Sequence, residues 1–165
     1  MFSRHRSDPA LIATSMKNLF EPTRAQELKQ RIAQLRPDSE RHWGKMTPAQ
    51  ALEHCARSME TALGDTVPPR MFIGRIVGGL VKNKVLANDE PIGRNSPTLK
   101  EFVVRDHPDM AAERARLSAL IDRFTAGGAK ACTTQPHSFF GPLTPDEWAI
   151  LMYKHLDHHL RQFGA

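Results

Sequence analysis

The sequence contains only two cysteines, Cys55 and Cys132, and they form no CxxC pair. This scarcity excludes a disulfide framework, so a reducing cytoplasm is the expected compartment. No apolar run approaches the roughly 20 residues that a transmembrane helix needs. The basic N-terminal stretch lacks the continuous apolar region of a signal peptide. We therefore expect a cytoplasmic protein with no membrane partner.

Aromatic residues are also scarce, at 7% of the chain, and they do not alternate with basic residues as base-stacking surfaces require. The net charge of +5 and the pI of about 9.6 would otherwise suit a nucleic-acid partner. However, the basic residues are spread along the chain and are mixed with Asp and Glu in the helical stretches. We interpret them as a solvated basic surface and expect no nucleic-acid binding.

A globular composition is present instead, with 40% hydrophobic and 25% charged residues in 165 positions. This length is typical of one domain with a real core, so we expect a single domain over residues 1–165. Residues 1–19 show no helical pattern and are expected to be a loosely attached N-terminal segment.

Helical periodicity dominates the rest of the chain, and no stretch predicts a strand. The first predicted helix, about Arg24 to Leu35, places Leu28, Ile32 and Leu35 on one face. Another, about Pro108 to Phe124, has an apolar stripe and is closed by Gly127 and Gly128. Its stripe consists of Met110, Leu117, Leu120, Ile121 and Phe124.

Two further helices open with nearly the same letters, "MTPAQALEHC" and "LTPDEWAILM". In the first, Thr47 is placed to cap the helix and Gln50 to complete a capping box, with Gly64 as the stop. In the second, Thr144 and Glu147 occupy the same two positions. The chain is therefore expected to be all-α with four main helices.

The connection from about Asp65 to His107 is too long for a simple turn between antiparallel helices. It predicts a long crossover that lets the second and third helices run parallel. Within it, the Phe72 to Leu86 stretch could be a helix, an extended cover or an amphipathic membrane-surface segment. Its glycines do not favour any one of these.

Three of the eight histidines lie within five positions of the last helix, in "KHLDHHLRQ". His155 and His159 are about 40° and one turn apart, so both rings can reach one point. His158 is about 60° to the other side. The pair shares its stripe with Trp148 and Met152, which places it on the inward face.

His54, on the second helix, lies among the small residues Ala51, Cys55 and Ser58, which leave room for a ring and its ligand. Alone, it could be a hydrogen-bonded core histidine, and an i,i+4 pair also arises on exposed faces. Together with His155 and His159 it completes a set of three neutral imidazoles, which is a standard metal-ligand set. No fourth protein ligand is evident, so coordination positions would stay open, as in catalytic sites.

The stretches "WGKMTPAQALEHC", "SPTLKEF" and "HSFFGPLTPDEWAILMYKHLDHHLRQFG" resemble the DinB-like (YfiT-type) metal-binding bundles, in particular a bacterial branch without an assigned reaction. The resemblance implies an up-down-down-up four-helix bundle with a long crossover between helices two and three. It also implies a divalent metal, zinc or nickel, bound by His54, His155 and His159, with His158 as a neighbour that is not a ligand. Members of this superfamily include thiol-dependent transferases and isomerases, and an amide hydrolase-type activity.

These observations together predict a metal-dependent enzyme acting on a small molecule, with a low-molecular-weight thiol as nucleophile in a transferase. The alternatives are a hydrolase that uses metal-bound water and a non-catalytic, structural metal-binding bundle; a homodimer is left open. Four basic residues are candidates for fixing an anionic co-substrate, against the simpler interpretation of a solvated surface. They are Arg70, Arg75, Lys82 and Arg161.

Overall fold

The computed structural model describes residues 16–94 and 102–165. Within these ranges the chain is all-helical, as predicted, and the strand-like pairing consists of one isolated bridge between His137 and Gly141. The elements are α1 (Pro22–Gln34), α2 (Pro48–Leu63), α3 (Phe72–Val85), α4 (Met110–Gly127), the short 3₁₀ helix η2 (Gly128–Ala131) and α5 (Pro145–Arg161).

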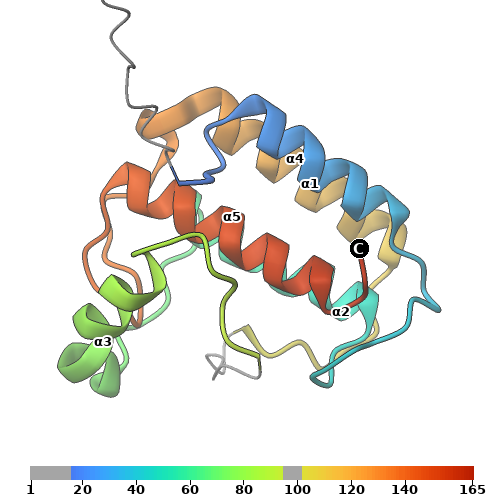
Figure 1. Ribbon diagram of the computed structural model, residues 1–165, viewed down its shortest axis with the longest axis horizontal. Coiled ribbons are helices and arrows are strands. Elements are labelled where there is room, and N and C mark those ends of the chain that lie inside the picture. The colour runs from blue at the N-terminus through green and yellow to red at the C-terminus, as the bar shows by residue number, and fades with distance from the viewer. Residues whose placement is uncertain (1–15, 95–101) are drawn as a thin grey trace, which may run out of the picture.

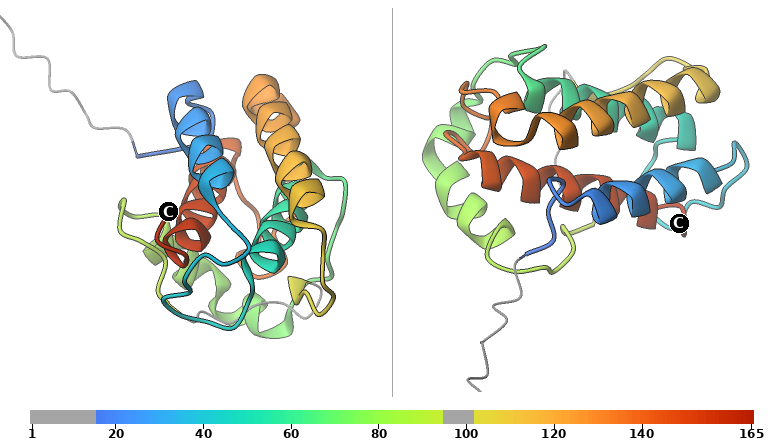
Figure 2. Two further views of the ribbon diagram at one scale, coloured as in Figure 1. Left: turned by 90° about the vertical axis from the view of Figure 1, so that its right-hand side faces the viewer. Right: turned by 90° about the horizontal axis from the view of Figure 1, so that it is seen from above.

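Four of the helices pack around a shared core, with α1 beside α5 and α4 beside α2 (Figure 2). Helices α1 and α5 run in one direction, and α2 and α4 run in the other (Figure 1). Helix α3 lies outside this group, across α2 and α5. The expectation of a four-helix bundle is therefore not confirmed as stated, because the described part of the chain holds five α-helices.

The predicted capping boxes position the two helices that carry the histidines. The Thr47 hydroxyl accepts the backbone N–H of Gln50 at 3.2 Å, and the Gln50 side chain accepts the Thr47 N–H at 2.9 Å. Thr144 and Glu147 repeat both bonds at the start of α5. Each box satisfies two N–H groups that the first helical turn cannot pair, so both helices begin at residues fixed by local sequence.

The core lies between α1, α2, α4 and α5 and consists of the predicted apolar faces. Leu28 and Ile32 from α1 meet Ile121 and Phe124 from α4, and all four are fully buried. Burying each such side chain contributes on the order of 1.5–3 kcal/mol, which makes this layer the main source of stability. The histidines of α2 and α5 line a cavity whose wall also includes residues of α3.

Helix α3 shows that the crossover segment is helical rather than extended. Gly74 and Gly78 lie against the backbone of Phe139, and a Cβ on Gly74 would be 2.5 Å from its carbonyl oxygen. The glycines therefore allow a close helix-to-loop approach that any larger residue would prevent. The opposite face exposes Phe72, Ile76 and Leu80. No helix in the described ranges is long and apolar enough to cross a membrane.

The N-terminal segment expected to be loosely attached falls mainly on residues 1–15, outside the described residues. Its last residue, Leu19, is fully buried, and its N–H donates to the carbonyl of Ala149 at 3.0 Å. The carbonyl of Leu19 accepts the Thr125 hydroxyl at 2.9 Å. The "SPTLKEF" stretch also lies outside the described residues, except for Phe102.

Candidate metal centre

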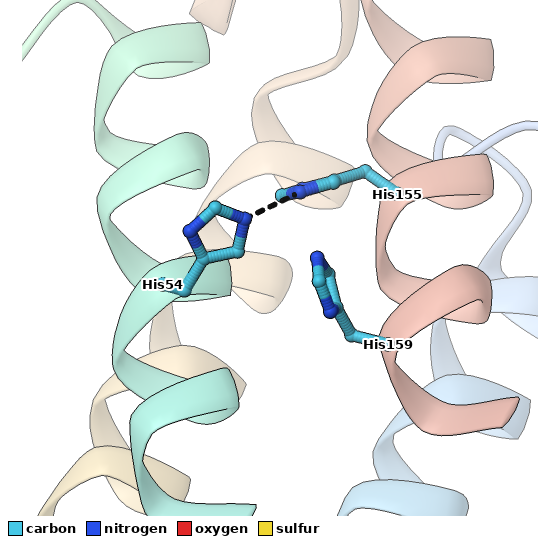
Figure 3. A group of neighbouring side chains, drawn as sticks. All are labelled: His54, His155 and His159. Carbon is cyan, nitrogen blue, oxygen red and sulfur yellow. Dashed lines mark hydrogen bonds between the residues drawn. The ribbon is translucent and has the colours of Figure 1, made fainter. Parts of the chain in front are cut away.

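The three predicted ligands converge from two helices. His54 projects from α2, and His155 and His159 project from α5 toward it (Figure 3). The Nε2 atoms of His54 and His155 are 2.9 Å apart, and one ring nitrogen from each of the three residues lies within 4.8 Å of the others. Such a group could hold a metal ion.

The protonation of His54 follows from its outer partner. Its Nδ1 lies 3.0 Å from the carbonyl oxygen of Phe102. A carbonyl can only accept, so Nδ1 carries the hydrogen and the Nε2 of the neutral ring keeps its lone pair. That lone pair belongs to the nitrogen that faces His155, which is the form a metal ligand requires.

His159 is oriented by a longer relay. Its Nδ1 is 3.0 Å from the side-chain oxygen of Gln162, and the Gln162 amide nitrogen donates to the carbonyl of Trp43 at 2.7 Å. The Trp43 carbonyl thereby fixes which end of the amide faces His159, so Nδ1 donates and Nε2 is free to bind. Gly44 makes this possible, because a Cβ there would lie 2.5 Å from the Gln162 nitrogen.

Burial keeps the three rings uncharged. It lowers the pKa of His54, and it lowers the pKa of His159 to about 3 with a further contribution from the neighbouring His54. The pKa of His155 is well below its usual value, first because of burial and then because His159 and His54 are close. Neutral imidazole is the ligating form, so at neutral pH the cluster is ready to bind a cation.

His158, the doubled histidine, points elsewhere. Its Nδ1 donates to the carbonyl of Ile92 at 3.1 Å, and its ring lies 5.6 Å from that of Trp43. The Arg94 guanidinium covers the same Trp43 ring at 4.4 Å. Thus His158 ties the crossover to α5 and is outside the group of three, as the resemblance implied.

A cavity of about 530 Å³ adjoins the three histidines and lies between α2, α3 and α5. Besides the histidines, its walls are mainly apolar. They include Met71, Ile73, Val77, Val81, Val85, Ile92, Phe102, Phe139, Phe140, Trp148, Leu151 and Met152. A space of this size can accept a small organic molecule next to the candidate ligands.

His137 lines the same cavity and was missed as a site residue by the sequence analysis. Its Nδ1 accepts the backbone N–H groups of Phe139 and Phe140, each at 3.1 Å. Burial, with a smaller contribution from the charge of Arg70, lowers its pKa to about 4. In the sequence, His137 stands out only as part of the "HSFFGP" stretch. Because this stretch is a loop, it has no periodicity from which the orientation of the side chain could be predicted.

None of the four basic residues considered for a co-substrate is among the described residues that line this cavity. Arg70 donates to the carbonyl of His137, and Lys82 pairs with Glu147 at 2.8 Å. Arg161 pairs with Asp157 at 2.7 Å, and Arg75 is on the exposed side of α3. Lys82 and Arg161 are thus paired with acidic residues, and the Arg75 side chain is exposed to water.

The comparisons with known proteins give one match. A family model described as "Protein of unknown function (DUF1569)" matches residues 8–165. No curated protein and no solved structure matches the chain. The matched range includes all three histidines of the cluster, His137 and every helix described above.

Proposed function

We propose that this protein, which belongs to the DUF1569 family, is a metal-dependent enzyme whose divalent ion is bound by His54, His155 and His159. The observation that carries the proposal is the convergence of three neutral imidazoles at the wall of a cavity large enough for a substrate. A structural ion is normally enclosed by four protein ligands. Three protein ligands beside a cavity leave coordination positions that water or a substrate could occupy.

The residues present fit such an ion. Two of the three rings have their ligating nitrogen fixed by an outer hydrogen bond, His54 through Phe102 and His159 through Gln162. No carboxylate belongs to the set, so a bound divalent ion would keep its full charge and lower the pKa of a coordinated water or thiol. The protein holds its ligands neutral and places them beside mainly apolar walls.

The resemblance to the DinB-like bundles supports the same proposal. The directions of α1, α2, α4 and α5 (Figure 1) are compatible with the up-down-down-up order that the resemblance implies, with α3 as a further helix in the crossover. Zinc and nickel are the ions that this resemblance favours, and imidazole nitrogen is a good ligand for both.

Two nucleophiles are compatible with the site, a small thiol in a transferase and water in a hydrolase. The absence of a basic side chain among the described residues of the cavity wall weighs against a strongly anionic thiol. A rival of another class is a structural ion that joins α2 to α5. In that case no small molecule bound in the cavity would coordinate the ion.

The test begins with elemental analysis of untagged protein, which should find about one divalent ion per chain. A cobalt-substituted form is then titrated with 2-mercaptoethanol and with glutathione while its visible absorption is recorded. A new thiolate-to-cobalt band indicates a thiol nucleophile, and a spectrum that changes with pH alone indicates water. A spectrum that responds to neither would contradict an open, catalytic site.

A further inference from the structure

We propose that the cavity binds a substrate with an apolar body and one electronegative head group, the head lying between the three-histidine cluster and His137. The inference rests on the proposed metal site and adds the class of substrate to it. It is carried by two separate features, the chemistry of the cavity walls and the hydrogen-bonding state of His137.

The walls of the cavity suit an apolar molecule from three directions. Helix α3 contributes Val77 and Val81, α5 contributes Leu151 and Met152, and Phe140 belongs to the loop before α5. The described residues that line the cavity include no Asp, Glu, Lys or Arg. A ligand with several charges would therefore lose its hydration without gaining a partner, whereas an apolar chain would gain from leaving water.

The two hydroxyl residues in the wall do not change this character. The Ser58 hydroxyl donates to the carbonyl of His54, and the Thr61 hydroxyl donates to the carbonyl of Arg57, each at 3.1 Å. Both hydrogens are thus used by the helix that carries them. The polar part of a ligand is directed instead to the histidine end of the cavity.

His137 lies close enough to His155 to contribute to the lowered pKa of that ring, and its own ring is held as a neutral donor. Because its Nδ1 accepts two backbone N–H groups, the hydrogen of the neutral ring lies on Nε2. Within the described chain, no residue accepts that hydrogen. The ring is fixed between Phe140 at 4.8 Å and Trp148 at 5.5 Å, measured between ring centroids. Its N–H can donate to an oxygen or sulfur lone pair of the head group without carrying charge.

The body of the ligand is tested with alkyl hydroxamates of increasing length. Acetohydroxamate, butanohydroxamate, hexanohydroxamate and octanohydroxamate are titrated into the cobalt-substituted protein, and the visible spectrum reports binding. Affinity should rise about three- to fourfold for each methylene that enters the cavity. The variant Val77→Asp places a charge in the wall and should abolish this rise. Its control, Ile76→Asp on the exposed face of α3, should preserve it.

The head group is tested with His137→Asn. Asparagine can still accept the loop N–H groups but has no donor at the position of Nε2. All four hydroxamates should weaken by one common factor, about two- to tenfold, while the gain per methylene stays unchanged. Imidazole NMR of ¹⁵N-labelled wild-type protein should show hydrogen on Nε2 of His137. The role of His137 would be overturned if the variant changes the gain in affinity per methylene or leaves the affinity unchanged. Hydrogen on Nδ1 of His137 in the wild type would overturn it as well.

The apolar cavity can be examined without the ion. In protein treated with EDTA, the neutral dye Nile red should bind with a rise in fluorescence. Octanohydroxamate should displace it, and acetohydroxamate and glutathione should not. If cobalt binds and the short hydroxamate coordinates but length has no effect, the substrate class is wrong and the metal site stands. If cobalt does not bind while Nile red does, the proposed metal function fails instead.

Discussion

The Nε2 atoms of His54 and His155 lie 2.9 Å apart, although 101 positions separate the two residues in the chain. Since Nδ1 of His54 donates to Phe102, its Nε2 offers a lone pair toward the neighbouring ring. His159 brings a third such nitrogen into the same space. Lone pairs of ring nitrogens that face each other at this distance repel unless a proton or a cation lies between them. A metal ion that binds here in the folded protein should therefore raise the free energy of unfolding.

The first prediction concerns the ligands. His159→Ala should lose most of the bound metal, whereas the matched variant of its neighbour, His158→Ala, should retain about one ion per chain. Only the first of the two side chains belongs to the converging group. To compare the two variants, the metal content is measured after dialysis and the melting temperature is measured with and without EDTA. Equal metal loss in both variants would contradict the assignment.

A comparison of His159→Ala with the wild type also distinguishes a catalytic ion from a structural one. For a catalytic site, His159→Ala should remain folded with a moderate loss of stability and should lose the response of the cobalt spectrum to small ligands. If the melting temperature instead collapses and the wild type binds no such ligand, the ion has a structural role.

The second prediction concerns the relay that orients His159. Gln162→Leu removes the acceptor for Nδ1, so metal affinity should fall by about 10- to 100-fold. Gly44→Ala should act in the same direction, because its Cβ would displace the Gln162 amide. Competition with a chromophoric chelator gives the affinity. Gln34→Leu, on the exposed end of α1, is the control and should change nothing.

The third prediction is a loss of stability in acid for the metal-free protein. The pKa of His137 is lowered to about 4 by burial, while the unfolded chain has its histidines near 6.5. Between these values the unfolded state binds more protons, so the free energy of unfolding should fall as pH drops from about 6.5 to about 4.

His137 should account for up to about 3 kcal/mol of this loss, on the order of 1.4 kcal/mol per pH unit. Urea unfolding at several pH values in EDTA measures it. His137→Asn should make the profile shallower by the share of His137, because the other buried histidines still contribute, and His107→Asn, an exposed position, should leave it unchanged. A profile that is flat in the wild type would refute the buried neutral state.

The fourth prediction uses two adjacent glycines of α3. A Cβ on Gly78 would collide with the carbonyl oxygen of Phe139, whereas a Cβ on Gly79 meets nothing within 4 Å. Gly78→Ala should therefore destabilise α3 by about 1–3 kcal/mol and increase hydrogen exchange along it. Gly79→Ala should stabilise the helix by about 0.5–1 kcal/mol. If both variants behave alike, α3 does not pack on the loop as described.

The sequence by itself determined the local features of this protein. The capping boxes at Thr47 and Thr144, the apolar faces of the helices and the shared face of His155 and His159 all depend on spacing within one helix. Such spacing is visible in the sequence because the helical repeat is constant. The approach of His54 to that pair was predicted from the small residues around His54 and from the resemblance.

Only the tertiary structure decided how distant segments complete the site. The Trp43 carbonyl that orients Gln162, the loop that fixes His137 and the packing of α3 on Phe139 depend on contacts between chain segments with no common periodicity. Lys82 and Arg161 illustrate the same limit, since the sequence gives their charge but not the pairing with Glu147 and Asp157. Local spacing is set by covalent geometry, whereas these contacts are set by packing of the whole chain.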